Sequence, residues 1–291
     1  MVNPAGEKGP ESALPEFSGM LHGGNVLREL CVDGRNAIRP WGVEFADSSA
    51  FYSLEDGEGY RYEVLESEET TGPKSREILQ VVRMREGLVR VHLNERWDGT
   101  REIRHTCTLT CLEDTTLMDF VLRYRFLSAR VPRGYIGGRE VPFIGSSIYH
   151  QYPVDSAAVG NERYSVSVAV LGKTVPACMK AYVYLRDSED AWVLHLRMLP
   201  VAWHKEVIKL CSRWFGTRPV PQWASAALLR VPGVRAALWY RGERRPWRNR
   251  IARVFSPNAY PMAHVRKGEV LSWDAVCKLG PPVRVPGAMP W

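Results

Sequence analysis

Apolar and polar residues alternate along most of the chain between residues 49 and 198. A period of two is the spacing of side chains on one face of a β-strand, and it recurs in segments separated by clusters of Asp, Gly and Glu. The segments are GYRYEVLES, SREILQVVRMR, GLVRVHLNERW, REIRHTCTLTC, TTLMDFVLRYRF, RYSVSVAVLG, CMKAYVYLR and AWVLHLRM. Because no helical spacer stands between them, the pattern predicts an all-β fold, a large antiparallel β-sandwich.

One hairpin, GLVRVHLNERWDGTREIRHTC, has a register that its burial pattern predicts. A three-residue WDG loop with a left-handed glycine pairs Leu93 with Ile103, which brings apolar residues opposite one another. His105 then lies on the apolar face of its strand. Glu95 is expected on that same face, opposite Arg101.

The period changes after residue 200. EVIKLCSRWF carries an apolar stripe with helical spacing, and WASAALLR and WRNRIARVF suit further short helices. Strand alternation returns in EVLSWDAVCKLG. We therefore predict a disordered leader at 1–17 and a single β-sandwich domain at 18–291, with a basic helical insertion at about 200–255.

The segment 204–254 differs from the rest of the chain in charge. Its twelve Lys or Arg and two Glu give +10, whereas the whole chain carries +7, and four of the ten tryptophans fall within it. Tryptophan and arginine together suit a structural cover over the sheet, which we favour because amphipathic helices usually bury their apolar stripe. An anionic membrane surface or a protein partner is the second interpretation. Nucleic acid is not expected, because no RNP1, KH or zinc-finger motif is present.

Several function classes lack their sequence signatures. There is no G-x-x-x-x-G-K-[ST], G-x-S-x-G or H-E-x-x-H motif, and the six cysteines form no C-x-x-C pair. We therefore predict neither a metal nor a cofactor. The start of the sequence shows no basic region followed by an apolar stretch, and no run approaches the roughly 18 apolar residues of a membrane span, so a cytoplasmic location is expected.

Three stretches resemble the galactose mutarotase-like β-sandwich superfamily, which includes aldose epimerases and sandwich domains of polysaccharide lyases. HGGNVLRELCVDGRNAIRPWG is similar to its opening hairpin, VRKGEVLSWDAVCKLG to its closing strand, and IYHQYP to its His-x-Tyr element. The resemblance implies a supersandwich-like fold with a sugar site on a concave sheet face. The sequence departs from epimerases in the PVD that follows His-x-Tyr. It also has no counterpart of their late glutamate base, because Glu269 lies in the KGEV turn and is expected only to cap the strand that follows.

The resemblance implies that His150 is a catalytic acid or base. Histidine suits this work because its pKa lies near neutrality, and Tyr152 would be the second proton carrier. Tyr149 is expected to bind substrate. The alternative is that SSIYHQYP is an edge strand whose histidine faces solvent.

Further candidates come from the strand faces. His105 and Glu95 suit either acid–base catalysis or a buried, hydrogen-bonded core pair. Arg123 and Arg125 lie on the face of TTLMDFVLRYRF opposite its core stripe, where they suit exposed salt bridges or an anionic substrate group. His264 is predicted beside a closing strand, either near the cleft or in a loop.

The sequence thus favours an enzyme that uses acid–base chemistry, of the isomerase, lyase or cyclase type. Its substrate would be a polar, possibly anionic saccharide or small metabolite held in a concave sheet cleft. One alternative is a cyclase or isomerase of a more hydrophobic metabolite. The other is a non-catalytic module that binds carbohydrate, lipid or a partner protein.

Overall fold

The computed structural model describes most of the predicted sandwich. The described residues are 17–20, 29–32, 35–47, 51–53, 63–84, 86–97, 101–143, 149–151, 154–188, 190–201 and 262–284. The predicted leader at 1–17 and the predicted helical insertion at about 200–255 lie outside these ranges except at their ends.

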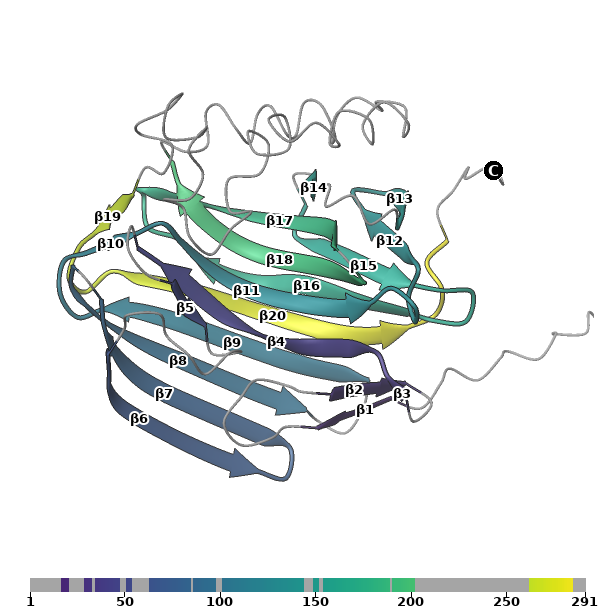
Figure 1. Ribbon diagram of the computed structural model, residues 1–291, viewed down its shortest axis with the longest axis horizontal. Coiled ribbons are helices and arrows are strands. Elements are labelled where there is room, and N and C mark those ends of the chain that lie inside the picture. The colour runs from purple at the N-terminus through teal and green to yellow at the C-terminus, as the bar shows by residue number, and fades with distance from the viewer. Residues whose placement is uncertain are drawn as a thin grey trace, which may run out of the picture.

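Two large antiparallel sheets make up the body of the fold (Figure 1). The nine-stranded sheet has the order β13-β12-β15-β16-β20-β9-β8-β7-β6. Its strands are β6 (Glu63–Gly72), β7 (Ser75–Arg83), β8 (Leu88–Trp97), β9 (Glu102–Cys111), β12 (Arg133–Ile136), β13 (Arg139–Pro142), β15 (Ser156–Gly160), β16 (Ser165–Thr174) and β20 (Val270–Gly280).

The six-stranded sheet has the order β14-β17-β18-β11-β4-β5. Its strands are β4 (Ile38–Ala46), β5 (Phe51–Ser53), β11 (Asp119–Leu127), β14 (Tyr149–Gln151), β17 (Met179–Ser188) and β18 (Ala191–Pro200). Two small sheets complete the described part. They contain β1 (Phe17–Met20), β2 (Glu29–Val32) and β3 (Arg35–Asn36), and β10 (Thr115–Leu117) with β19 (Ala263–Val265).

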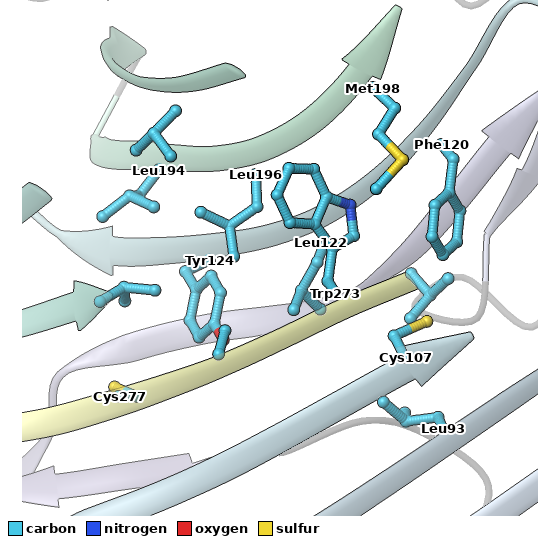
Figure 2. Close-up of a cluster of buried hydrophobic side chains, with 14 of the residues drawn as sticks. Leu93, Cys107, Phe120, Leu122, Tyr124, Leu194, Leu196, Met198, Trp273 and Cys277 are labelled. Carbon is cyan, nitrogen blue, oxygen red and sulfur yellow. The ribbon is translucent and has the colours of Figure 1, made fainter. Parts of the chain in front are cut away.

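The core lies between the two large sheets and follows the predicted alternation. Phe120, Leu122 and Tyr124 from β11 are buried there, and Leu194, Leu196 and Met198 of β18 lie beside them (Figure 2). Trp273 of β20 packs against this layer from the other sheet (Figure 2). All nine segments with strand alternation, including EVLSWDAVCKLG, contain strands, so the antiparallel β-sandwich is confirmed.

The strand β6 extends further than its alternation indicates. The sequence ESEETTG was expected to separate two strands, but it forms most of β6, which pairs with β7 at the edge of the sheet. Nine of its ten positions are exposed. A strand without a buried face shows no period of two, and for that reason the pattern missed it.

The register predicted for the β8–β9 hairpin is wrong by four residues. Leu93 pairs with Cys107 instead of Ile103, and Glu95 pairs with His105 instead of Arg101. The longer connection therefore lets Trp97 pair with Ile103. Because the difference is an even number of residues, each side chain stays on the face that was predicted.

The turn of the opening hairpin and the turn before the closing strand are both present. Val32 pairs directly with Arg35, which closes β2 and β3 in a two-residue hairpin. Before β20, Gly268 has a φ of 85°, a left-handed conformation that glycine adopts without steric cost. The carboxylate of Glu269 accepts a hydrogen bond from the Arg266 amide at 2.7 Å, so Glu269 caps this turn as predicted.

Candidate functional site

Three charged or polar residues form a row across neighbouring strands on the inner face of the nine-stranded sheet. Arg76 of β7 pairs with Glu95 of β8, and Glu95 pairs with His105 of β9. Each is 0% exposed, and each alternates with residues of the hydrophobic core. We call Arg76, Glu95, His105 and the tyrosine that contacts them, Tyr124, the interior polar row.

The row connects the two sheets through His105. Its Nδ1 lies 3.1 Å from the hydroxyl of Tyr124, which comes from β11 in the opposite sheet. Its Nε2 lies 3.4 Å from Oε1 of Glu95, without hydrogen-bond geometry. In Figure 2 the hydroxyl of Tyr124 points from β11 toward the nine-stranded sheet.

Burial determines the protonation of the row. Desolvation lowers the pKa of His105 from 6.5 to about 3, so the imidazole is neutral at pH 7. Burial also raises the pKa of Tyr124, so its phenol keeps its proton. If the phenol donates to Nδ1, the neutral ring carries its hydrogen on Nε2, toward Glu95.

Arg76 is the least satisfied member of the row. Its Nε donates to Glu69 of β6 at 2.9 Å, whereas its Nη1 lies 3.9 Å from Oε2 of Glu95. Neither Nη1 nor Nη2 has a hydrogen-bond acceptor among the described residues. Buried donors normally have partners, so these two nitrogens mark a position for the oxygen of a ligand or of water. Glu69 has a 27% exposed side chain and is the place where the row approaches solvent.

The sequence analysis identified Glu95 and His105 but missed Arg76 and the contact with Tyr124. A signal for Arg76 is present in SREILQVV, where the arginine is in phase with Ile78 and Val82, both of which are buried. Arg76, Glu95 and His105 share one feature: each is a charged or titratable residue at a strand position where the alternation predicts an apolar side chain.

A second polar set lies on the other face of the six-stranded sheet. Arg123 and Arg125 alternate with Tyr124 along β11, so they point away from the core. Neighbouring strands add residues at the same phase. We call the following set the outer polar face: Glu44, Asp119, Arg123, Arg125, Tyr184, Arg186, His195 and Arg197.

Ion pairs on the outer polar face are buried, whereas the sequence suggested exposed salt bridges. Arg197 donates from Nε to Oδ2 of Asp119 at 2.9 Å and from Nη1 to the hydroxyl of Tyr184 at 2.9 Å. Arg123 pairs with Glu44, which is also buried. His195 and Arg197 were not predicted, although they alternate with leucines in AWVLHLRM.

The other predicted site residues lie elsewhere. His150 pairs with Leu185, and Tyr149 pairs with Arg186, in the edge strand β14, whereas Tyr152 is outside the described residues. His264 pairs with Thr116 in the small β10–β19 sheet and is exposed.

The structure therefore divides the predicted site into separate groups. It brings Glu95 and His105 into contact between the sheets, while Arg123 and Arg125 lie across the six-stranded sheet from them. A small ligand that contacts the interior polar row does not reach these two arginines, because β11 and its neighbours stand between them. The two groups have to be considered as different sites.

Metal-ligating residues and thiols are the other candidates for chemistry in the described ranges. There, no three His, Cys, Asp or Glu side chains gather as they would around a metal ion. Cys107, Cys111, Cys178 and Cys277 are free thiols, and burial raises the pKa of each, most of all for Cys107. The same part of the chain contains no helix with the length and apolar character needed to cross a membrane.

Comparisons with known proteins gave structural similarity only. No family model and no curated protein sequence matches the chain. A putative aldose 1-epimerase from Escherichia coli K12 is 9% identical with a TM-score of 0.48, over 92% of this chain and 99% of that one. A galactose mutarotase-like protein from Lactobacillus casei is 9% identical with a TM-score of 0.44, over 91% and 100%.

An aldose epimerase homologue from C. elegans is 8% identical with a TM-score of 0.39, over 92% of this chain and 99% of that one. These proteins belong to the group that the sequence resembles. Identities of 8–9% and TM-scores below 0.5 assign neither membership of that family nor an activity to this chain.

Proposed function

We propose that this protein is an enzyme that uses acid–base chemistry, of the isomerase, lyase or cyclase type, on a saccharide or a similar polar metabolite. The interior polar row carries this proposal. It combines a buried carboxylate, a neutral imidazole and a guanidinium with two nitrogens that have no acceptor among the described residues. Perturbed titratable groups that gather at one place are a common mark of active sites.

Each residue of the row has a role in the proposed chemistry. Glu95 takes a proton from the substrate and returns it. His105, kept neutral by burial, donates a hydrogen bond from Nε2 to the substrate oxygen on which negative charge develops. Arg76 binds a second substrate oxygen through Nη1 or Nη2, and Tyr124 fixes the tautomer and orientation of the imidazole.

The charge of the row favours a neutral substrate. Two carboxylates, Glu69 and Glu95, accompany one guanidinium, and His105 is uncharged at pH 7. Counted over the described residues, Glu69 and the row together are negative by one unit, which disfavours an anionic substrate. Sugar hydroxyls suit it better, because one hydroxyl accepts from Arg76 and donates to Glu95.

His150 and Tyr152 remain predictions for the same chemistry. Their motif resembles the element that carries the catalytic histidine in aldose epimerases, and its strand β14 lies beside Tyr184 and Arg186. If His150 is required for activity and the interior polar row is not, the active site is at β14.

A hydrophobic metabolite is the second candidate substrate. Leu93, Ile103 and Cys107, all fully buried, flank Glu95 and His105 on β8 and β9. An apolar wall of this kind suits a cyclase or isomerase whose substrate presents a single polar group to the row.

Proton NMR in deuterium oxide tests the proposal with the full chain. Faster anomer interconversion or loss of a C–H signal to deuterium would report an isomerase, new alkene signals a lyase, and the signals of a new ring a cyclase. The substrates are a panel of neutral sugars, uronic acids and apolar cyclic metabolites. We expect turnover with a neutral sugar, and a loss of at least about 100-fold in Glu95→Gln.

The matched control is Glu102→Gln, which makes the same chemical change on the same hairpin at an exposed ion pair with Lys278. It should keep wild-type turnover. If Glu95→Gln also keeps it while His150→Ala abolishes it, the active site is at β14. If the NMR signals of a sugar broaden but the sugar is not converted, the protein is a non-catalytic carbohydrate-binding module.

A further inference from the structure

The strand β6 forms one edge of the nine-stranded sheet. Among the described residues its only strand partner is β7, and Figure 1 places it at the lower border of the sheet. Nine of its ten residues are exposed, so one side of the strand is open to solvent. In an antiparallel pair, every second residue directs its N–H and C=O toward the neighbouring strand, and the others direct theirs away from it. The edge of β6 therefore presents backbone donors and acceptors with which another strand can pair.

The edge of β6 is long and regular enough to hold a partner strand. The seven residues 66–72 pair with β7 in one continuous register, and the register shift of this pair lies between Val64 and Glu66. Proteins usually protect an edge with a short strand, a proline or lysines, whereas β6 has ten residues and contains neither of these residue types. Val64 and Leu65 are each 45% exposed, which adds apolar surface that a partner would cover.

The charge of β6 determines which partner it fits. The strand contains four glutamates and no lysine or arginine. Glu69 pairs with Arg76 on the inner face of the sheet, whereas Glu66 and Glu68 alternate with it and point to the solvent face. No ion pair within the described residues involves Glu66 or Glu68. A second copy of this strand would bring carboxylates together, and like charges opposite each other destabilise a strand pair, whereas lysine or arginine there would form ion pairs.

We propose that β6 is a docking edge for an extended, basic segment of a partner protein, which joins the nine-stranded sheet as a further strand. Backbone hydrogen bonds supply the affinity in this kind of recognition, and side chains at alternate positions supply the selectivity. Two Lys or Arg residues, spaced two positions apart in the partner, face Glu66 and Glu68. The same carboxylates that keep two copies of this chain apart therefore select a basic partner.

This interaction goes beyond the proposed catalytic function. The interior polar row begins at Arg76 and lies between the sheets, whereas Glu66 and Glu68 point to solvent on the other face of the nine-stranded sheet. Docking on β6 needs no substrate, so it is measured independently of any turnover. The test variants keep Glu69, because its carboxylate accepts a hydrogen bond from Nε of Arg76.

Fluorescence anisotropy with a labelled peptide of alternating lysine and valine tests the docking edge on the full chain. We expect saturable binding that weakens with added salt, and an affinity about tenfold lower in the Glu66→Gln, Glu68→Gln double variant. A peptide with proline in place of each valine keeps the charge but cannot pair as a strand, so it should not bind. Hydrogen exchange should show that the bound lysine–valine peptide protects amides of residues 63–72.

The matched control is the Glu113→Gln, Glu162→Gln double variant, which removes two exposed carboxylates elsewhere in the chain. It changes the net charge by the same amount and should bind the peptide as the wild type does. The proposal is overturned if the wild type does not bind the peptide, or if the control loses as much affinity as the β6 variant. Equal binding of the proline peptide, or unchanged exchange in β6 on binding, would also overturn it. So would a dimer of the free protein that protects β6, because the occupant of the edge would then be a second copy.

Discussion

The interior polar row and the outer polar face both contain a guanidinium, a carboxylate, an imidazole and a phenol, in two different arrangements. Between the sheets they are Arg76, Glu95, His105 and Tyr124. On the outer polar face they are Arg197, Asp119, His195 and Tyr184. Composition alone does not distinguish these quartets, so their geometry has to decide which one has a structural role and which one is available to a ligand.

The arginines differ most. Arg197 donates to Asp119 from Nε and Nη2 and to Tyr184 from Nη1, so all three of its nitrogens are engaged. Arg76 bonds only through Nε, and its Nη1 stays 3.9 Å from the nearest carboxylate oxygen of Glu95. Arg197, Asp119 and Tyr184 of the outer quartet form a closed network that joins β11, β17 and β18, whereas Arg76 of the interior quartet has two nitrogens without an acceptor among the described residues.

The largest expected effect comes from breaking the closed network. Asp119→Ala leaves the buried guanidinium of Arg197 without its carboxylate, and we expect a loss of about 3–5 kcal/mol in the free energy of unfolding, measured by urea denaturation. Replacing both partners, as in Asp119→Leu with Arg197→Met, should restore most of it. Equal losses in the single and double variants would show that the pair itself does not stabilise the sheet.

The next effect is a pH dependence that comes from His105 of the interior polar row. The pKa of His105 is about 3 in the folded protein and 6.5 when unfolded, so the neutral form stabilises the fold above pH 6.5. This contribution is lost as the pH falls from 6.5 toward 3, by up to about 1.4 kcal/mol per pH unit. Between pH 6.5 and 5, wild type should lose more stability than His105→Gln. If the stability of wild type and of His105→Gln changed equally with pH, the burial of a neutral imidazole at His105 would be contradicted.

A matched pair of tyrosine variants should have smaller effects. Tyr124→Phe removes the partner of His105 Nδ1, and Tyr184→Phe removes the acceptor of Arg197 Nη1. Each should lower the free energy of unfolding by about 1–2 kcal/mol. The comparison predicts that Tyr124→Phe alone also lowers kcat, because only that tyrosine contacts a residue of the proposed catalytic set. Comparable losses of kcat in both variants would remove the distinction.

The smallest effect is expected at the solvent face of the nine-stranded sheet. Arg104 pairs with Asp274 there, and its side chain is 57% exposed. Asp274→Asn should change the melting temperature by no more than 1–2 °C at moderate salt, because water and ions screen exposed pairs. A larger change would mean that burial does not separate the strong ion pairs of this protein from the weak ones.

The sequence predicted strands better than it predicted contacts between them. Alternation identified the strand faces because it reports local burial, and it placed Glu95 and His105 on one face even though the hairpin register was wrong. It did not show that Arg123 and His105 lie on opposite sides of the six-stranded sheet, because that depends on which strands pair and on how the two sheets pack. Arg76 was missed for a similar reason: its partners Glu69 and Glu95 come from other strands.

Rates and melting temperatures of two variants test most directly the claim that the interior polar row is the functional site. With the saccharide that the wild type converts, kcat/KM is measured for Arg76→Gln and for the Asp119→Leu, Arg197→Met double variant. We predict that Arg76→Gln, assayed below its melting temperature, loses about 100-fold in kcat/KM, while the folded double variant keeps its rate within about threefold. A double variant that folds but loses activity, beside an active Arg76→Gln, would contradict the account and move the site to the outer polar face.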